Sequence, residues 1–164
     1  MPESVSDHLL VIDGIKGESN DSKHPGAIAV HDFSWGNVNC GSAATGGGAG
    51  AGKVQFKDIK FHARSNIASP LLALCCASGK HFAKGQFFVR KQGDHQHDYY
   101  VISLEDFIVS TFDSGGSDLA DGVPEDTFTL NFARIKFEYK RQRPDGTLDA
   151  PITMGWDVKQ NRQV

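Results

Sequence analysis

Residues 128–139, FTLNFARIKFEY, alternate between apolar and polar side chains and change phase once. Phe128, Leu130 and Phe132 occupy even positions, whereas the apolar side chains after Arg134 occupy odd ones. Alternation with a period of two predicts a β-strand, and a change of phase predicts a bulge or a sharp bend within it. This stretch therefore predicts a long strand that bends once and buries opposite sets of side chains in its two halves.

Two other stretches change phase in the same way. In residues 28–35, Ile28 and Val30 give way to Phe33 and Trp35, and residues 54–61 show the same change. A small sheet that closes on itself requires strands that bend partway. The three stretches together predict a small closed β-barrel rather than a flat sandwich.

The remaining apolar runs, with 11 Phe and 18 Gly, are typical of strands and turns. Further strands are expected at residues 9–12, 86–91, 99–104, 107–112 and 152–158. The fold class is therefore mainly β, with about eight strands.

One segment predicts a short helix. Ser69 is an N-cap candidate, Pro70 stands at the first helical position, and Gly79 lies just beyond the end. Because the segment has almost no polar face, we expect the helix to be buried on several sides, closing a barrel end or lying at a subunit contact. Cys75 and Cys76 are then small core residues.

The composition describes one ordinary globular domain, residues 1–164. Hydrophobic residues make up 39%, charged residues 23%, and the net charge of -3 comes with scattered basic residues, so nucleic-acid binding is not expected. No run approaches the roughly 20 apolar residues that span a bilayer, and the start does not resemble a signal peptide, so no membrane partner is expected. Three cysteines, two of them adjacent, fit a reducing cytoplasm better than a disulfide framework.

A glycine-rich connection, residues 37–53, cannot build a core of its own and is expected to serve a function. Gly47, Gly52 and Lys53 match part of a phosphate-binding loop. Val54 replaces the Ser or Thr that binds magnesium, and a strand follows instead of a helix. A nucleotide-binding enzyme is kept as an unfavoured alternative.

Other candidates for chemistry are weak. His95 and His97 could ligate a metal, but their polar segment is typical of a hairpin turn and no second cluster supplies more ligands. The adjacent carboxylates Glu105-Asp106 and Glu125-Asp126 would point to opposite sides of a strand and are interpreted as solvated. We therefore predict no catalytic residue, no metal site and no cofactor.

Many short motifs resemble, in order, the haemolysin-coregulated protein (Hcp) family, which forms the inner tube of type VI secretion systems. They are Asp13-Gly14-Ile15-Lys16-Gly17-Glu18-Ser19, His24, Ile28, Phe33-Ser34-Trp35-Gly36, Phe61-His62, Ser69-Pro70-Leu71, Cys76, Gly79-Lys80-His81-Phe82, Tyr99-Tyr100, Leu104-Glu105-Asp106, Phe132, Ile135 and Tyr139. The stretch 43–52 and the loop 114–117 depart from the family pattern.

The resemblance implies hexameric rings that stack into a hollow tube inside a contractile sheath. It also implies a trimeric spike at the tip, small effector proteins in the lumen, and expulsion of a cytoplasmically assembled tube to the exterior or a target cell without a signal peptide. Another ring-forming tail-tube protein, such as that of a contractile phage, is the related alternative.

The resemblance also implies that the long connection reaches a neighbouring subunit or ring. The positions concerned are Asn37, Cys40, Gly46, Gly47, Gly48, Gly50, Gly52 and Lys53. Separately, alternation places Phe33 and Trp35 on one face and leaves Ser34 on the other. Ser34 is therefore either a lumen-facing residue or simply a small core or surface residue.

Overall fold

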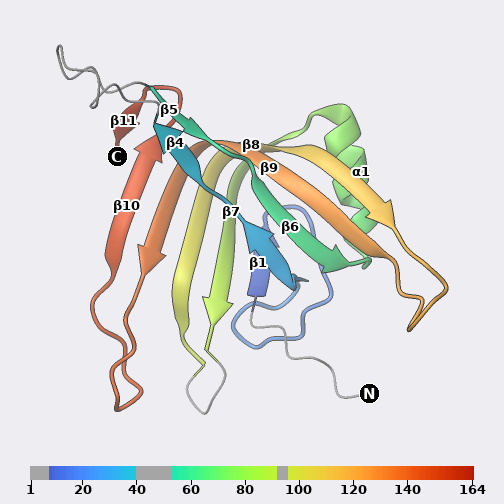
Figure 1. Cartoon of the computed structure of the whole chain (residues 1–164), viewed down its shortest axis with the longest axis horizontal. Coiled ribbons are helices and arrows are strands. Elements are labelled where there is room, and N and C mark those ends of the chain that lie inside the picture. Colours follow the sequence, from blue (N-terminus) through green and yellow to red (C-terminus); the bar gives the residue numbers. More distant parts are fainter. Residues whose placement is uncertain (1–7, 40–52, 92–95) are drawn as a thin grey trace.

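The computed structural model describes residues 8–39, 53–91 and 96–164, which contain eleven strands and one helix (Figure 1). The strands are β1 (His8–Ile12), β2 (Ile28–Ala29), β3 (Asp32–Ser34), β4 (Asn37–Asn39), β5 (Val54–Phe56), β6 (Ile59–Arg64), β7 (His81–Arg90), β8 (Asp98–Gly115), β9 (Glu125–Tyr139), β10 (Ile152–Asp157) and β11 (Arg162–Gln163); the helix is α1 (Ser69–Ser78).

Strand β9 organises the main sheet and bends as the sequence predicts. It pairs with β8 along its length, with β6 over its first half and with β10 over its second half. Phe132 and Ala133 are both buried, so the buried set of side chains changes phase at this point. The predicted phase change in residues 128–139 is confirmed.

The other two predicted bends are breaks between separate strands. β2 pairs with β1 whereas β3 pairs with β6, and the backbone N–H groups of Val30 and His31 donate to the carbonyls of His8 and His62, each over 3.0 Å. The chain therefore crosses from one strand to another at Val30 and His31. A similar break separates β5, which pairs with β4, from β6.

The predicted mainly β fold with one short helix is confirmed, but the predicted closure of the sheet into a barrel is not observed among the described residues. Strand pairing runs from β2 through β1, β7, β8, β9 and β6 to β3. No ladder joins β2 to β3 among the described residues, and only the chain at Val30 and His31 bridges them. The strand count exceeds eight because several strands are very short.

Two predicted strands, residues 99–104 and 107–112, are one continuous strand, β8. Asp106 adopts a positive φ of 50° and interrupts the apolar pattern, while the pairing to β7 and β9 continues on both sides of it. A break in side-chain pattern therefore need not break the ladder.

A row of four phenylalanines crosses the core side of the sheet, with two fully buried members at its middle and two partly buried members at its ends. Phe33, Phe61, Phe128 and Phe112 are register partners across β3, β6, β9 and β8. Phe61 and Phe128 are fully buried, with ring centroids 5.5 Å apart. Each such side chain contributes about 1.5–3 kcal/mol through burial.

Helix α1 ends where the sequence predicts and begins one residue earlier. Gly79 has a φ of 66°, and the N–H groups of Gly79 and Lys80 donate to the carbonyls of Cys76 and Cys75. The predicted N-cap is wrong, because Ala68 occupies that position and Ser69 is the first helical residue.

The prediction that α1 is buried on several sides is also wrong. Leu72 and Cys75 are its buried residues, whereas Leu71 and Leu74 are 42% and 62% exposed. The helix therefore packs through one face, against β8 and the core, and presents another apolar face to solvent. Within the described part of the chain, no helix is both long and apolar enough to cross a membrane.

Candidate assembly surfaces

The outer surface of β3, β6, β9 and β8 is polar from one edge to the other. Two rows of register partners flank the phenylalanine row: Ser34, Lys60, Thr129 and Thr111 in one, and Asp32, His62, Thr127 and Asp113 in the other. We call these eight side chains the polar face. Strand alternation explains it, because each apolar side chain that points into the core leaves its two neighbours pointing out.

Hydrogen bonds link the side chains of the polar face to one another. The hydroxyls of Thr111 and Thr129 lie 2.6 Å apart, and the Thr127 hydroxyl lies 2.9 Å from His62 Nδ1. Ser110, beside them, donates to Asp58 over 2.6 Å. The threonine hydroxyls and His62 therefore have hydrogen-bond partners within the chain, and the other polar side chains of this face suit contact with water.

Ser34 is exposed and lies beside Lys60 on the polar face. Its neighbours point inward: Phe33 packs 4.7 Å from Phe87, and Trp35 Nε1 donates to the Tyr100 hydroxyl over 2.7 Å. The predicted alternation is confirmed, and Ser34 is not a core residue.

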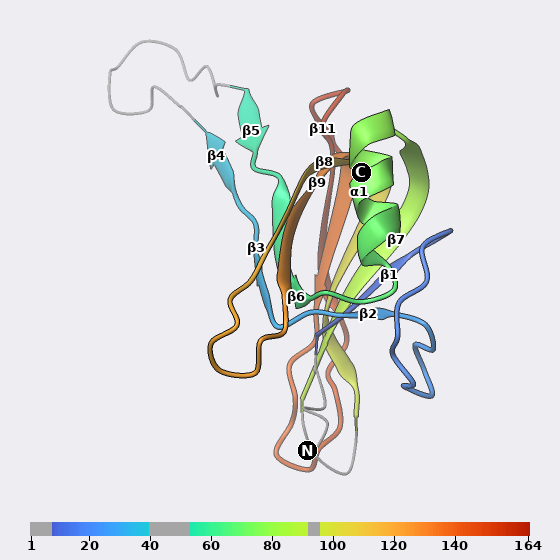
Figure 2. The same cartoon turned by 90° about the vertical axis from the view of Figure 1, so that its right-hand side faces the viewer.

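The ends of the glycine-rich connection form a hairpin of β4 and β5. Asn37 pairs with Phe56 and Asn39 with Val54, so the two ends of the connection are strands, which the sequence did not predict for residues 37–39. A polar Asn-Val-Asn strand gives no alternation that sequence reasoning could detect. Figure 2 shows this hairpin projecting from the body of the molecule.

Of the positions expected to reach a neighbour, Asn37 and Lys53 are exposed in or beside this hairpin. Cys40, Gly46, Gly47, Gly48, Gly50 and Gly52 lie outside the described residues. Lys53 leads directly into β5, so no helix N-terminus follows it.

A buried carboxylate fixes the start of α1. Asp126 is 1% exposed, so the prediction of a solvated residue is wrong. It accepts hydrogen bonds from the hydroxyls of Ser65 and Ser114, over 2.7 and 2.9 Å, and from that of Ser69. Alternation places Asp126 on the core side of β9, and the three hydroxyls offset the cost of burying its charge.

Another buried charge anchors the loop between β1 and β2. Arg90 is 5% exposed and donates to Asp98 over 2.8 Å and to Asp21 over 3.0 Å. Burial disfavours the ionised form of Asp21, but hydrogen bonds from Arg90 and from backbone N–H groups outweigh it and lower its pKa.

This arrangement bears on the histidine pair that we considered as a metal site. Asp98, which flanks it, is engaged by Arg90 and by His24, whose Nε2 lies 2.8 Å from the carboxylate. His95 lies outside the described residues. Among the residues that the structure describes, no group of three metal-ligating side chains comes together.

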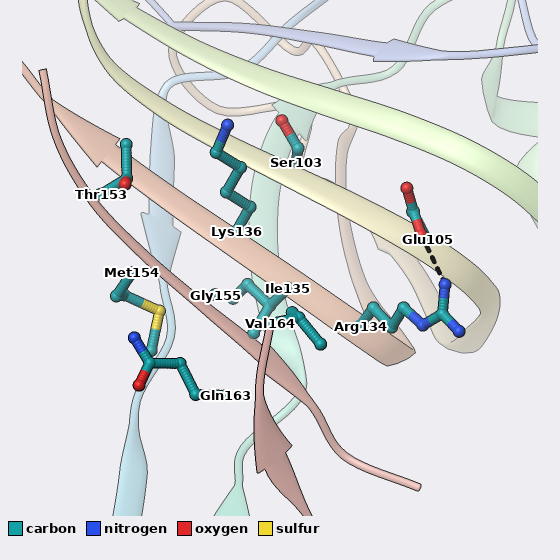
Figure 3. Close-up of a pocket in the computed structure, with 10 residues that line it drawn as sticks. All are labelled: Ser103, Glu105, Arg134, Ile135, Lys136, Thr153, Met154, Gly155, Gln163 and Val164. Atoms are coloured by element: carbon teal, nitrogen blue, oxygen red, sulfur yellow. Dashed lines mark hydrogen bonds and ion pairs between the residues drawn. The ribbon is translucent and has the colours of Figure 1, made fainter. Parts of the chain in front are cut away.

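A groove of about 450 Å³ lies between β8, β9, β10 and the C-terminal strand β11 (Figure 3). It is lined by Ser103, Glu105, Arg134, Ile135, Lys136, Thr153, Met154, Gly155, Gln163 and Val164. Arg134 donates to Glu105 over 3.2 Å and to Asp157 over 2.9 Å, which holds its guanidinium against the wall.

Comparison with known proteins identifies the family. The model described as "Type VI secretion system effector, Hcp" matches residues 9–139, well over half of the chain. The chain belongs to the Hcp family. Protein hcp1 of Pseudomonas aeruginosa is 39% identical over 159 residues, covering 96% of this chain and 98% of that protein.

Solved structures agree with the Hcp assignment. Hcp1 from Salmonella typhimurium has a TM-score of 0.77 at 30% identity, covering 96% of this chain and 97% of that one. A type VI secretion system effector from Yersinia pestis has a TM-score of 0.74 at 27% identity, covering 92% and 99%. A third structure, a type six secretion system protein at 23% identity and a TM-score of 0.91, shares the fold over 96% of this chain and 98% of its own.

Membership of the Hcp family makes this chain a structural protein and not an enzyme, as the sequence predicts. The nucleotide-binding alternative is therefore dropped. Sequence reasoning missed two features of this Hcp protein: the hydroxyl cage around Asp126 and the exposed leucines of α1. Ser65 and Ser114 are too far from Asp126 along the chain for any local pattern to reveal the first.

Proposed function

We propose that this protein is the tube subunit of a type VI secretion system, a single domain spanning residues 1–164. Six copies form a ring, and rings stack into a hollow tube that a sheath surrounds and a trimeric spike caps. The tube is assembled in the cytoplasm and expelled by sheath contraction, with effector proteins in its lumen.

The polar face is the observation that carries this proposal. The polar face lies across four paired strands, and the phenylalanine row lies on the opposite side of the same strands. All side chains in the two rows of the polar face, including Ser34, Lys60 and Thr129, are polar. A channel for folded cargo needs a hydrated, non-adhesive lining, and a pleated sheet surface of this composition supplies one. Ser34 then faces the lumen.

The β4–β5 hairpin supports assembly. Both strands stand off the main sheet, and Asn37, Val38 and Asn39 are all exposed, so among the described residues β4 pairs with β5 but is not buried against the core. We assign the hairpin and the glycine-rich segment between its two strands in the sequence to contact with a neighbouring subunit or ring. In the ring, each protomer takes the shape of a barrel. The chain at Val30 and His31, which hydrogen-bonds to His8 and His62, joins the two end strands β2 and β3.

Negative-stain microscopy combined with native mass measurement on one sample tests the proposal. Six-fold rings with a central channel, at six times the protomer mass, are expected. A species that stays monomeric at high concentration would refute it.

A further inference from the structure

Helix α1 carries an apolar stripe that its own chain leaves uncovered. Leu71 and Leu74 are 42% and 62% exposed, and their spacing of three places them on one side of the helix. Ile67, in the turn just before the helix, is 56% exposed. We call these three residues the α1 stripe. Helix α1 has no acidic residue in its first turn and no basic residue in its last, so nothing charged offsets this surface.

We propose that the α1 stripe binds the β4–β5 hairpin of the next copy in the assembly. The inference rests on the proposed function, because it names the surface that receives the hairpin. Both views show the hairpin and α1 on different sides of the molecule (Figures 1 and 2), so a hairpin cannot reach the α1 stripe of its own chain. A contact between two different surfaces of identical chains propagates from copy to copy, as rings and filaments require.

The hairpin offers an apolar side chain that matches the α1 stripe. Val38, on β4, is 45% exposed and has no buried neighbour on its own strand. An exposed valine on a projecting strand and exposed leucines on an uncharged helix gain by leaving water together.

Charge around the two surfaces is complementary. The described hairpin residues, 37–39 and 53–57, include Lys53 and Lys57 and no carboxylate. Residues 113–126, at the end of β8 and the start of β9, include five carboxylates and no base. Of these, Asp126 is buried, Asp113 belongs to the polar face, and Asp121 and Glu125 pair with Arg64 and His31. Asp118 is the carboxylate that remains open to a lysine of a neighbour. This acidic segment adjoins α1, since Asp126 accepts a hydrogen bond from Ser69 and Ser65 N–H donates to Pro124 O over 3.0 Å.

The size of the contact also favours a repeated interface over an isolated dimer. Three partly exposed side chains offer a few hundred Å², less than the roughly 800 Å² that each partner buries in a stable pair. A weak contact of this kind holds when it is repeated around a closed ring, because each closure is intramolecular.

The test introduces opposite charges on the two surfaces, one at a time and then together. Light scattering and negative-stain imaging over a range of protein concentrations measure ring formation. Leu74→Glu is expected to raise the concentration at which half of the protein is in rings by at least about tenfold. Val38→Lys should do the same. The double variant, which places a lysine opposite a glutamate at every contact, should recover most of the loss.

Ile152→Glu is the matched control, because Ile152 is 77% exposed on β10, outside both the α1 stripe and the acidic segment, and its replacement should leave assembly unchanged. Thermal unfolding of each variant at a concentration below ring formation confirms that the protomer folds. If Leu74→Glu assembles like the unsubstituted protein, or if the double variant recovers nothing, the inference is overturned while the rings themselves still support the proposed function. If the unsubstituted protein forms no rings, the proposed function fails.

Discussion

The polar face and the α1 stripe are both exposed in the protomer, yet they differ in how their side chains are satisfied. Thr111, Thr127 and Thr129 on the polar face hydrogen-bond to their neighbours. Leu71 and Leu74 are apolar, so they form no hydrogen bonds with the water that they face. The difference indicates that the polar face is suited to contact with water, whereas the α1 stripe gains stability when another chain covers it.

The strongest way to break the polar face is to remove the core beneath it. Phe128→Ala should lower the free energy of unfolding by about 3–5 kcal/mol, because it removes a fully buried ring. Thr129→Val, one residue along on the outer surface, should cost about 1 kcal/mol or less. Urea unfolding at matched protein concentration measures both. Equal losses would contradict the assignment of the two surfaces of β9.

The hydrogen bonds that fix the start of α1 should have the next largest effect on stability. Asp126→Ala should lower the free energy of unfolding by about 3 kcal/mol. It removes three hydrogen bonds to a buried charge and leaves three serine hydroxyls without their acceptor. The adjacent Glu125→Ala, at an exposed position, should change stability by less than about 0.5 kcal/mol. The same unfolding experiment distinguishes them, and similar values for the two variants would show that Asp126 does not fix the helix.

Acid should loosen the loop between β1 and β2. The pKa of Asp21 is lower in the folded protein than the value of about 3.9 in an unfolded chain. The stability that this provides is therefore present above about pH 4 and is lost as the pH falls through the folded pKa. Asp21→Asn should be less stable than the unsubstituted protein at pH 7, and the difference should shrink on acidification. A difference that is independent of pH between 7 and 2 would contradict this account; Asp118→Asn, at an exposed site, is the control.

Ser34→Arg should have the smallest effect on the protomer and the most specific effect on function. Because Ser34 is exposed, unfolding should shift by no more than about 0.5 kcal/mol. If the polar face lines the lumen, six added arginines should reduce the amount of effector that co-purifies with the rings. Thr153→Arg, on the exposed outer side of β10, should not. Retention that is equal in both variants would remove Ser34 from the lumen.

Much of this architecture could be predicted from residues alone, because alternation is a local signal. The change of phase at Phe132 predicted the bend of β9, and Gly79 predicted the end of α1. The signal failed where strand partners changed: residues 28–35 look like one bent strand, but Val30 and His31 carry the chain from β1 to β6. It also failed for β4, whose two asparagines show no pattern.

Side-chain roles that depend on distant partners were beyond reach. Asp126 looks like half of a solvated carboxylate pair until Ser65 and Ser114 are placed beside it. The leucines of α1 look like core residues, because composition shows that a helix is apolar but not how many of its faces find a neighbour. Surfaces that await another copy of the chain are indistinguishable from core in a single sequence.

The orientation of the polar face in the assembled ring is the central claim, and cryo-electron microscopy of the rings tests it directly. We expect the outer surface of β3, β6, β9 and β8 to line the channel, with Ser34 and Thr129 facing the lumen. A reconstruction in which that surface points to the outside of the ring, or is buried between subunits, would contradict the account.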